Sequence, residues 1–562
     1  MTARSRFTAG LLLIALLALA LRTIYPAADP PWRTTVGVVW HDEGAWVHNA
    51  RNKALFGAWR QDEWNPMFIA PVFTALEYAS FAAFGVGVRQ ARLVVELAGV
   101  ASVVLLALGV RRIGGDAAGL IAGALLATNY VYVMYDRAAI MEGLMTAFIA
   151  ASWYCSAQAR DRSWWGAAAG VCAVLAYFTK AAAAFYVGAL GLAAVWALWE
   201  TRRTPDAAER RVAIWTLGGV ALALGAALVV FVLPHWAEYR FYNWQMSVTR
   251  KPSYTLKSML DRVTWFPILH DTFTRMWFEL VVGAVGTAAL AVRWRRSSMA
   301  ERLLVLWVTV GTIELLLHDV GNERRFVFLI PALIAATALV LARDRRIALG
   351  PIPPAAVPIV LYVAYILFGP LARLPFLYEV RAPVRLALGL AGVFTAVAIA
   401  LRRRLAAWTA RQTLTIVAST SLALLVAAGD LVQFAEWAVD RTYKNYEASR
   451  LIGRVLPPET LVHGKLANGL SLENRIRPIF IGHEFGNYAD RKRRDDVRYI
   501  LTYIAPSAGY EGSQIMDVLA AYPHRRVIMT FDVAETIGGH DTAALIDKFG
   551  AEPAAETRRA HD

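Results

Sequence analysis

The chain has 562 residues, of which 57% are hydrophobic, and it carries a formal net charge of +15. A soluble domain does not need that much apolar surface to fill its core, so the composition indicates a membrane protein. Its Arg residues stand in short clusters beside apolar runs, which is typical of topology signals and lipid-phosphate contacts rather than of nucleic-acid binding. Cys155 and Cys172 both lie in apolar segments, which excludes a disulfide framework and a cysteine-based zinc site.

Apolar runs long enough to cross a bilayer recur from Leu11 to Ala428. If every run spanned, the Arg clusters would fall on the outer face, against the positive-inside rule. They return to the cytoplasm if Met67–Phe84 does not span, and its Pro71 and Glu77 suit an interfacial helix. The sequence therefore predicts a cytoplasmic N-terminus, an uncleaved first helix and about 13 transmembrane helices. The predicted spans are 8–25, 93–110, 116–134, 138–157, 164–179, 181–199, 212–233, 276–292, 303–318, 326–342, 354–370, 384–401 and 413–430.

This topology predicts two domains in a cell (plasma or inner) membrane protein. Residues 1–430 would form the transmembrane domain, with interfacial helices in the outer loop 26–92, and residues 431–562 would form an extracytoplasmic domain. After Tyr443 the pattern alternates between helix and strand, which predicts a small α/β domain with a last helix at Ala543–Phe549. Such a domain either covers the site, presents the acceptor or only packs. Strands are expected at 460–462, 478–481, 499–503 and 526–531.

Ionisable side chains gather at the outer boundary of the predicted bundle. Charged groups at that depth are costly unless they pair or line a wet cavity, so they are candidates for function. The candidates are His41, Asp42, Glu43, Asp136, Arg137, Glu142, Lys180, His318, Glu323, Arg324 and Arg325.

The basic candidates suit a phosphate. A lipid-linked sugar phosphate needs Arg or Lys to hold it and to stabilise the charge that develops as it leaves. Arg137, Lys180, Arg324 and Arg325 are predicted to do this. Nucleotide sugars and ATP are cytoplasmic, so a site on the outer face would draw on a lipid carrier. Other interpretations remain open, because Lys180 could simply extend to the interface and Asp136–Arg137 could be a local ion pair.

The acidic candidates suit proton transfer. An acceptor hydroxyl or amine needs a carboxylate to take its proton during attack, which fits Asp42 or Glu43. Asp136 and Glu142 are further acidic candidates, and Glu142 could orient the acceptor or share a divalent metal, Mg²⁺ or Mn²⁺, with Asp42. His41, His318 and Glu323 are expected to line the site or the acceptor path. An acidic pair beside a helix end can also be only a solvated loop or a cap.

Several segments together resemble the GT-C glycosyltransferases, in particular the branch that contains protein O-mannosyltransferases and the lipid A aminoarabinose transferase. Trp40–Ala45, with Pro66 and Pro71 after it, resembles the first outer loop of that branch. The other matching segments are Tyr135–Ala139 with Glu142, Phe178–Lys180 and Arg324–Ala332. The resemblance extends over about residues 8–345.

The resemblance implies a GT-C fold, a polyprenyl-phosphate sugar donor and inversion at the anomeric carbon. It further implies that Asp42 is the base, that Glu43 is its partner, and that Arg137, Lys180 and Arg324 or Arg325 hold the donor phosphate. The acceptor would be an extracytoplasmic protein, lipid or polysaccharide, with membrane lipid as the other partner and no nucleic acid.

Two departures from this branch bear on specificity. Its usual Lys-Pro-Pro is Ile69-Ala70-Pro71 here, and its Arg-Tyr pair is Arg325-Phe326. These differences remove a lysine and a phenol, which argues against transferring the aminoarabinose specificity. Two other functions stay open: a transporter or flippase of lipid-linked glycans, for which the sequence lacks internal repeats, and a non-catalytic scaffold for envelope assembly.

Overall fold

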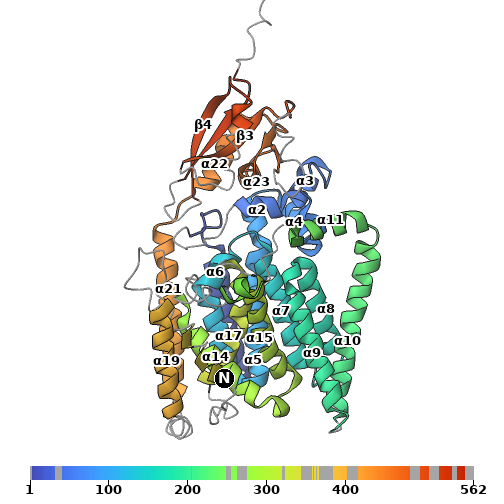
Figure 1. Cartoon of the computed structure of the whole chain (residues 1–562), viewed down its shortest axis with the longest axis vertical. Helices are drawn as coiled ribbons and strands as arrows, with labels where there is room; N and C mark the ends of the chain where they lie inside the picture. Colours follow the sequence, from blue (N-terminus) through green and yellow to red (C-terminus); the bar gives the residue numbers. More distant parts are fainter. Residues whose placement is uncertain are drawn as a thin grey trace, which may run out of the picture.

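The structure is a computed structural model in which a bundle of long helices carries a smaller domain with a β-sheet at one end (Figure 1). It describes residues 3–31, 41–203, 206–248, 255–261, 275–318, 323–342, 384–401, 416–480, 494–505, 518–534 and 541–550, with short pieces between 357 and 365. The predicted fold class, a helical membrane bundle followed by a small α/β domain, is confirmed.

Helices occupy nearly all of the predicted spans. They are α1 (Ala3–Thr23), α5 (Val88–Thr128), α6 (Tyr130–Asp136), α7 (Met141–Gln158), α8 (Trp165–Thr179), α9 (Ala184–Glu200), α10 (Ala207–Ala227), α14 (Trp277–Val292), α15 (Met299–His318), α16 (Glu323–Phe326), α17 (Ile330–Leu341), α19 (Val384–Ala400) and α21 (Ile416–Val439). The predicted span 354–370 lies largely outside the described residues.

Six helices in the described part of the chain are long and apolar enough to cross a membrane, or seven if α6 and α7, which are bent by 114°, form one span. Other predicted spans are present as shorter apolar helices, among them α8, α14 and α19. Within α5 the left-handed backbone of Gly115, with φ of 87°, separates two helices, as predicted for spans 93–110 and 116–134.

Glycine permits backbone contact between helices in the bundle. A Cβ atom added to Gly170 of α8 would lie 2.5 Å from the backbone nitrogen of Val220 in α10. One added to Gly219 of α10 would lie 2.3 Å from the carbonyl oxygen of Ala167. Without a hydrophobic driving force between helices in lipid, such close packing is a main source of their association.

Short helices cover the end of the bundle that faces the sheet domain (Figure 1). They are α2 (His41–Trp46), α3 (His48–Phe56), η1 (Pro66–Phe68), α4 (Pro71–Phe84) and α11 (Trp236–Val248). With 14 residues, α4 is shorter than a membrane-spanning helix, in agreement with the interfacial position predicted for Met67–Phe84.

The C-terminal domain is built on a five-stranded sheet of order β2-β1-β3-β5-β4, in which β1 is parallel to β2 and β3, and β5 is antiparallel to β3 and β4. Its elements are α22 (Lys444–Val455), β1 (Leu461–His463), α23 (Lys465–Gly469), β2 (Arg477–Ile479), β3 (Tyr499–Ala505), β4 (Arg526–Val533) and β5 (Asp541–Asp547). The helix predicted at Ala543–Phe549 is wrong, because this segment fills the gap between two strands as β5. Moreover, α21 continues beyond residue 430 to Val439.

Candidate active site

Four of the predicted site residues meet at the end of the bundle that faces the sheet domain. Arg324 of α16 donates from Nη1 to Oδ2 of Asp42 in α2 at 2.6 Å, and from Nε to Oε1 of Glu142 in α7. The ammonium of Lys180, which follows α8, donates to the same Glu142 oxygen. We call Asp42, Glu142, Lys180 and Arg324 the Arg324 cluster, because this guanidinium joins its two carboxylates.

The Arg324 cluster is enclosed on one side and accessible on the other. The Glu142 side chain is 1% exposed, whereas those of Asp42 and Lys180 are each 19% exposed. The second carboxylate oxygen of Glu142, Oε2, has no hydrogen-bond partner in the described part of the chain. Each cation in the cluster binds side-chain carboxylates, and carboxylate and phosphate oxygens are interchangeable partners of Arg and Lys.

Glu43, the neighbour of Asp42, belongs to a different contact. Its carboxylate accepts two hydrogen bonds from Arg92 of α5, both at 2.8 Å, and a third from the backbone nitrogen of Ala139 at 2.8 Å. Glu43 is 4% exposed. Arg92 and the turn after α6 therefore hold the Glu43 carboxylate and tie α2 to the bundle. The predicted role of Glu43 as partner of the base Asp42 stays a prediction.

Asp136 and Arg137 lie in a second charged group. Asp136 accepts two hydrogen bonds from Arg22 of α1, at 3.0 and 2.9 Å, and both side chains are fully buried. Arg137 donates to four backbone carbonyls at the end of α1, over distances of 2.6 to 2.9 Å, and its guanidinium lies 4.5 Å from the ring centroid of Trp437. We call Arg22, Asp136 and Arg137 the Arg137 cluster.

The Arg137 cluster differs from the predicted phosphate site. An α-helix leaves its last four carbonyls without intrahelical partners, and Arg137 satisfies four carbonyls from Leu21 to Tyr25. Its hydrogen-bonding groups are therefore already engaged by backbone that cannot move away. The structure thus places Arg137 against the carbonyls at the end of α1 and Asp136 in a buried ion pair with Arg22. The predicted action of both residues on the substrate stays a prediction.

Of the remaining predicted site residues, one lies near the Arg324 cluster and three have side chains outside the described part of the chain. Arg325 follows Arg324 in α16, is half-buried, and is close enough to Lys180 to act on it electrostatically. The side chains of His41, His318 and Glu323 are outside the described residues.

Sequence reasoning missed the arginines that pair with Glu43 and Asp136. Arg92 stands at the start of α5 and Arg22 near the end of α1, and both are buried. Each is an Arg inside or beside an apolar run, away from the Arg clusters predicted to be cytoplasmic. An arginine in such a position requires a buried partner, and that was its signal in the sequence.

The two carboxylates suggested as metal ligands do not fit a divalent cation in this arrangement. Arg324 stands between Asp42 and Glu142 and bonds to both. Within the ranges that the structure describes, no group of three or more His, Cys, Asp or Glu side chains is arranged to hold a metal.

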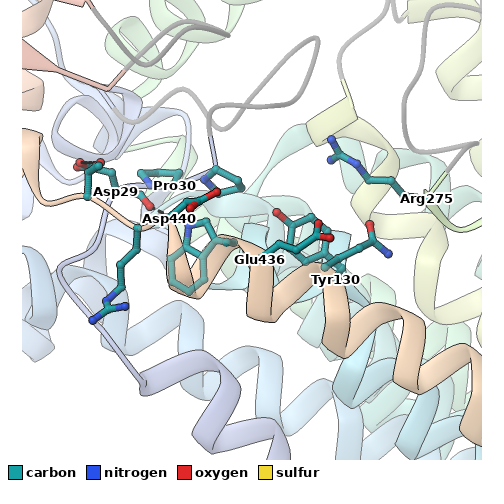
Figure 2. Close-up of a pocket in the computed structure, with 11 residues that line it drawn as sticks. Asp29, Pro30, Tyr130, Arg275, Glu436 and Asp440 are labelled. Atoms are coloured by element: carbon teal, nitrogen blue, oxygen red, sulfur yellow. Dashed lines mark hydrogen bonds between the residues drawn. The ribbon is translucent and has the colours of Figure 1, made fainter.

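A small pocket of about 180 Å³ lies beside the Arg137 cluster, between the segment after α1 and the end of α21. Figure 2 shows Asp29, Tyr130, Arg275, Glu436 and Asp440 around it. The Asp29 carboxylate accepts hydrogen bonds from the Thr442 hydroxyl and from the backbone nitrogens of Lys444 and Asn445, and burial raises the pKa of Asp29. None of its lining residues belongs to the Arg324 cluster.

The chain matches one protein family in sequence and several solved structures in fold. Residues 66–246 match the family of dolichyl-phosphate-mannose-protein mannosyltransferases. This segment contains Glu142 and Lys180 of the Arg324 cluster. No curated protein matches the chain in sequence.

Among solved structures, ArnT from Cupriavidus metallidurans in the apo state is similar with a TM-score of 0.54 and 15% identity over 98% of this chain and 100% of that chain. ArnT bound to undecaprenyl phosphate is similar with a TM-score of 0.50 and 17% identity, over 96% of this chain and 97% of that chain. The apo oligosaccharyltransferase of Archaeoglobus fulgidus is similar with a TM-score of 0.51 and 14% identity, over 89% of this chain and 70% of that chain. At these identities the likeness establishes the fold.

The chain therefore has the fold of the ArnT and oligosaccharyltransferase structures, and its segment 66–246 is similar to a family of mannosyltransferases. Both findings agree with the resemblance of its sequence motifs to the GT-C glycosyltransferases.

Proposed function

We propose that this protein transfers a sugar from a polyprenyl-phosphate carrier to an acceptor on the outer side of the membrane. The observation that carries the proposal is the position of Arg324, which joins the acidic Asp42 to a basic group around Glu142. Two relatives support the lipid donor: the family matched over residues 66–246 is named for dolichyl-phosphate-mannose, and an ArnT of the same fold holds undecaprenyl phosphate.

In the proposed reaction the acceptor oxygen or nitrogen attacks the anomeric carbon, and the bond from that carbon to the carrier phosphate breaks. Asp42 takes the proton of the acceptor, which makes the attacking atom a better nucleophile. The electron pair of the broken bond leaves with the polyprenyl phosphate, whose added charge is stabilised by Arg324, Lys180 and Arg325. Attack opposite the leaving group inverts the anomeric carbon.

Glu142 acts through the two cations rather than on the sugar. Its nearly buried carboxylate binds Lys180 and Arg324 at one oxygen, so it holds both side chains in place before the donor arrives. A phosphate would offer these cations the same kind of oxygen partner. The acceptor in this proposal is any protein, lipid or polysaccharide that presents a hydroxyl or an amine.

The proposal includes a topology. With the N-terminus in the cytoplasm, the Arg324 cluster, the short helices and the domain after α21 face the extracytoplasmic side, where lipid carriers present their sugars. The boundary between the two domains then falls near residue 440, at the end of α21.

The test is a transfer assay with purified protein. Wild type and Asp42→Asn are incubated with radiolabelled polyprenyl-phosphate sugars and with candidate acceptor fractions. We expect label in the acceptor with wild type, and a loss of about 1,000-fold or more with Asp42→Asn, the upper range for removal of a general base. If no donor gives transfer with wild type, a scaffold function replaces the enzymatic one, whereas movement of intact donor across a vesicle membrane would identify a flippase.

A further inference from the structure

The C-terminal domain touches the helix that carries Asp42 by direct backbone contact. Gly44 lies two residues after Asp42 in α2. A Cβ atom added to it would lie 1.9 Å from the carbonyl oxygen of Asn468 and 3.1 Å from the Cα atom of Gly469, both in α23. No side chain fits there. The separation of α2 from α23 is therefore set by two backbones, which adjust far less than flexible side chains do.

A buried hydrogen-bond network strengthens this contact. The side-chain nitrogen of Asn468 lies 3.0 Å from Nδ1 of His48, at the start of α3 directly after α2. The other ring nitrogen of His48 lies 2.9 Å from Oδ1 of Asp62 and 3.0 Å from the side-chain nitrogen of Asn52. His48, Asn52 and Asn468 are fully buried. Removing Asn468 from this network would leave the buried Nδ1 of His48 without this hydrogen-bond partner.

The network continues through the outer loop and returns to α2. Oδ2 of Asp62 accepts a hydrogen bond from the backbone nitrogen of Phe480 at 2.8 Å, and the Phe480 ring stacks on Trp64 with centroids 4.7 Å apart. The indole nitrogen of Trp64 donates to the carbonyl oxygen of Ala45 in α2 at 2.6 Å. The segment 466–480 of the C-terminal domain therefore holds α2 from two directions.

A buried arginine holds the same segment to α3. Arg51 donates to the carbonyl oxygens of Ser471, Asn474 and Ile476 at about 3.0 Å, and it is fully buried. Burial lowers the pKa of Arg51 to about 9. These buried contacts join the C-terminal domain to α3, so the domain is an integral part of this end of the molecule.

We propose that the C-terminal domain positions the catalytic base, with Asn468 as the positioning residue that fixes α2 through Gly44 and His48. The inference rests on the proposed function, in which Asp42 takes the proton of the acceptor. Asp42 meets Arg324 only if α2 stands at one position over the bundle. A displacement of about 1 Å at such a site costs roughly 100-fold in rate, so Asn468 acts on turnover from a distance.

The experiment compares Asn468→Ala with Arg475→Ala in the full-length protein. Arg475 is the matched control, because it belongs to the same segment but makes an exposed contact with the carbonyl oxygen of Leu55, away from α2. The readouts are kcat and KM with a radiolabelled polyprenyl-phosphate sugar, and the affinity for that donor. We expect Asn468→Ala to lower kcat about 30- to 100-fold, with KM and donor affinity within about twofold of wild type, and Arg475→Ala to behave as wild type.

Three outcomes overturn the inference. They are a wild-type kcat in Asn468→Ala, a change in KM alone, and an equal loss in both variants. If Asn468→Ala does not accumulate as folded protein, Asn468→Ser, which keeps a small polar side chain, is measured by the same criteria. Failure of the proposed function can be told apart from failure of the positioning role. If the proposed function is wrong, Asp42→Asn is active. If Asp42→Asn is inactive and the Asn468 variant has wild-type kcat, only the positioning role is contradicted.

Discussion

The Arg324 cluster and the Arg137 cluster both combine arginine with carboxylates at the same end of the bundle, yet their arginines have different partners. In the Arg137 cluster the guanidinium of Arg137 is bound by backbone carbonyls at the end of α1 and directly after it, which are part of the fold itself. In the Arg324 cluster the cations are bound by side-chain carboxylates and retain access to solvent. The comparison teaches that the partner of a buried charge, rather than its position in the membrane, separates a candidate site from a structural contact.

The largest difference between the two clusters is expected in turnover when Arg324 and Arg137 are each replaced by glutamine. Arg324→Gln should lower turnover by about 100- to 1,000-fold, since it removes a charge that stabilises the leaving phosphate. Arg137→Gln should leave turnover per folded molecule within about twofold of wild type and lower the free energy of unfolding by about 3 kcal/mol, because helix carbonyls lose their donors. Turnover normalised to folded protein, together with thermal unfolding in detergent, measures both. Equal losses of turnover would break the distinction.

The adjacent carboxylates Asp42 and Glu43 permit a similar comparison, in which a replacement of Glu43 is expected to change folding stability and not the transfer rate. Glu43→Gln leaves the buried guanidinium of Arg92 without a charged partner, and breaking a buried ion pair costs about 3 kcal/mol or more. The thermal midpoint should therefore fall, while the folded fraction keeps its rate of transfer. A variant of normal stability with no transfer would instead assign Glu43 to the chemistry.

The site residues that could be predicted from the sequence are those whose partners are side chains of opposite charge. Asp42, Glu142, Lys180 and Arg324 were identified because the topology predicted from hydropathy and the positive-inside rule places them at one membrane boundary. The contacts of Arg137 with the end of α1 were not foreseen, because backbone carbonyls have no sequence signature.

The fold shows the same limit of sequence reasoning. Span limits followed from apolar runs, and Gly115 separated two helices as expected. The segment at Ala543–Ile546 is compatible with helix or strand, and only its place between β3 and β4 decides for strand. The contact of Gly44 with Asn468 joins residues that are more than 400 positions apart, which one sequence without the fold cannot reveal.

The smallest effect concerns Glu77 of α4, which is fully buried with both carboxylate oxygens unpaired in the described part of the chain. Burial, with repulsion from Glu43 as a smaller cause, raises the pKa of Glu77 well above its ordinary value. Above about pH 4.5 the unfolded chain releases a proton that the folded protein keeps, so folding stability falls as pH rises, by at most roughly 1.4 kcal/mol per pH unit.

Glu77→Gln removes this proton linkage. The thermal midpoint of the variant should exceed that of wild type at pH 8, and the two should approach each other at pH 5. Differential scanning measurements at both pH values test this prediction. A variant that is equally destabilised at pH 5 and pH 8 would show that Glu77 is charged and paired in the folded protein.

The central claim is that Asp42 is the base, and it is tested most directly by transfer rates of Asp42→Asn and Asp136→Asn measured side by side with one labelled donor and acceptor. Each variant removes one carboxylate charge from the outer end, but Asp42 belongs to the Arg324 cluster and Asp136 to the Arg137 cluster. Asp42→Asn should lose about 1,000-fold or more in rate, while folded Asp136→Asn keeps its activity. Transfer by Asp42→Asn at the rate of wild type would contradict the account.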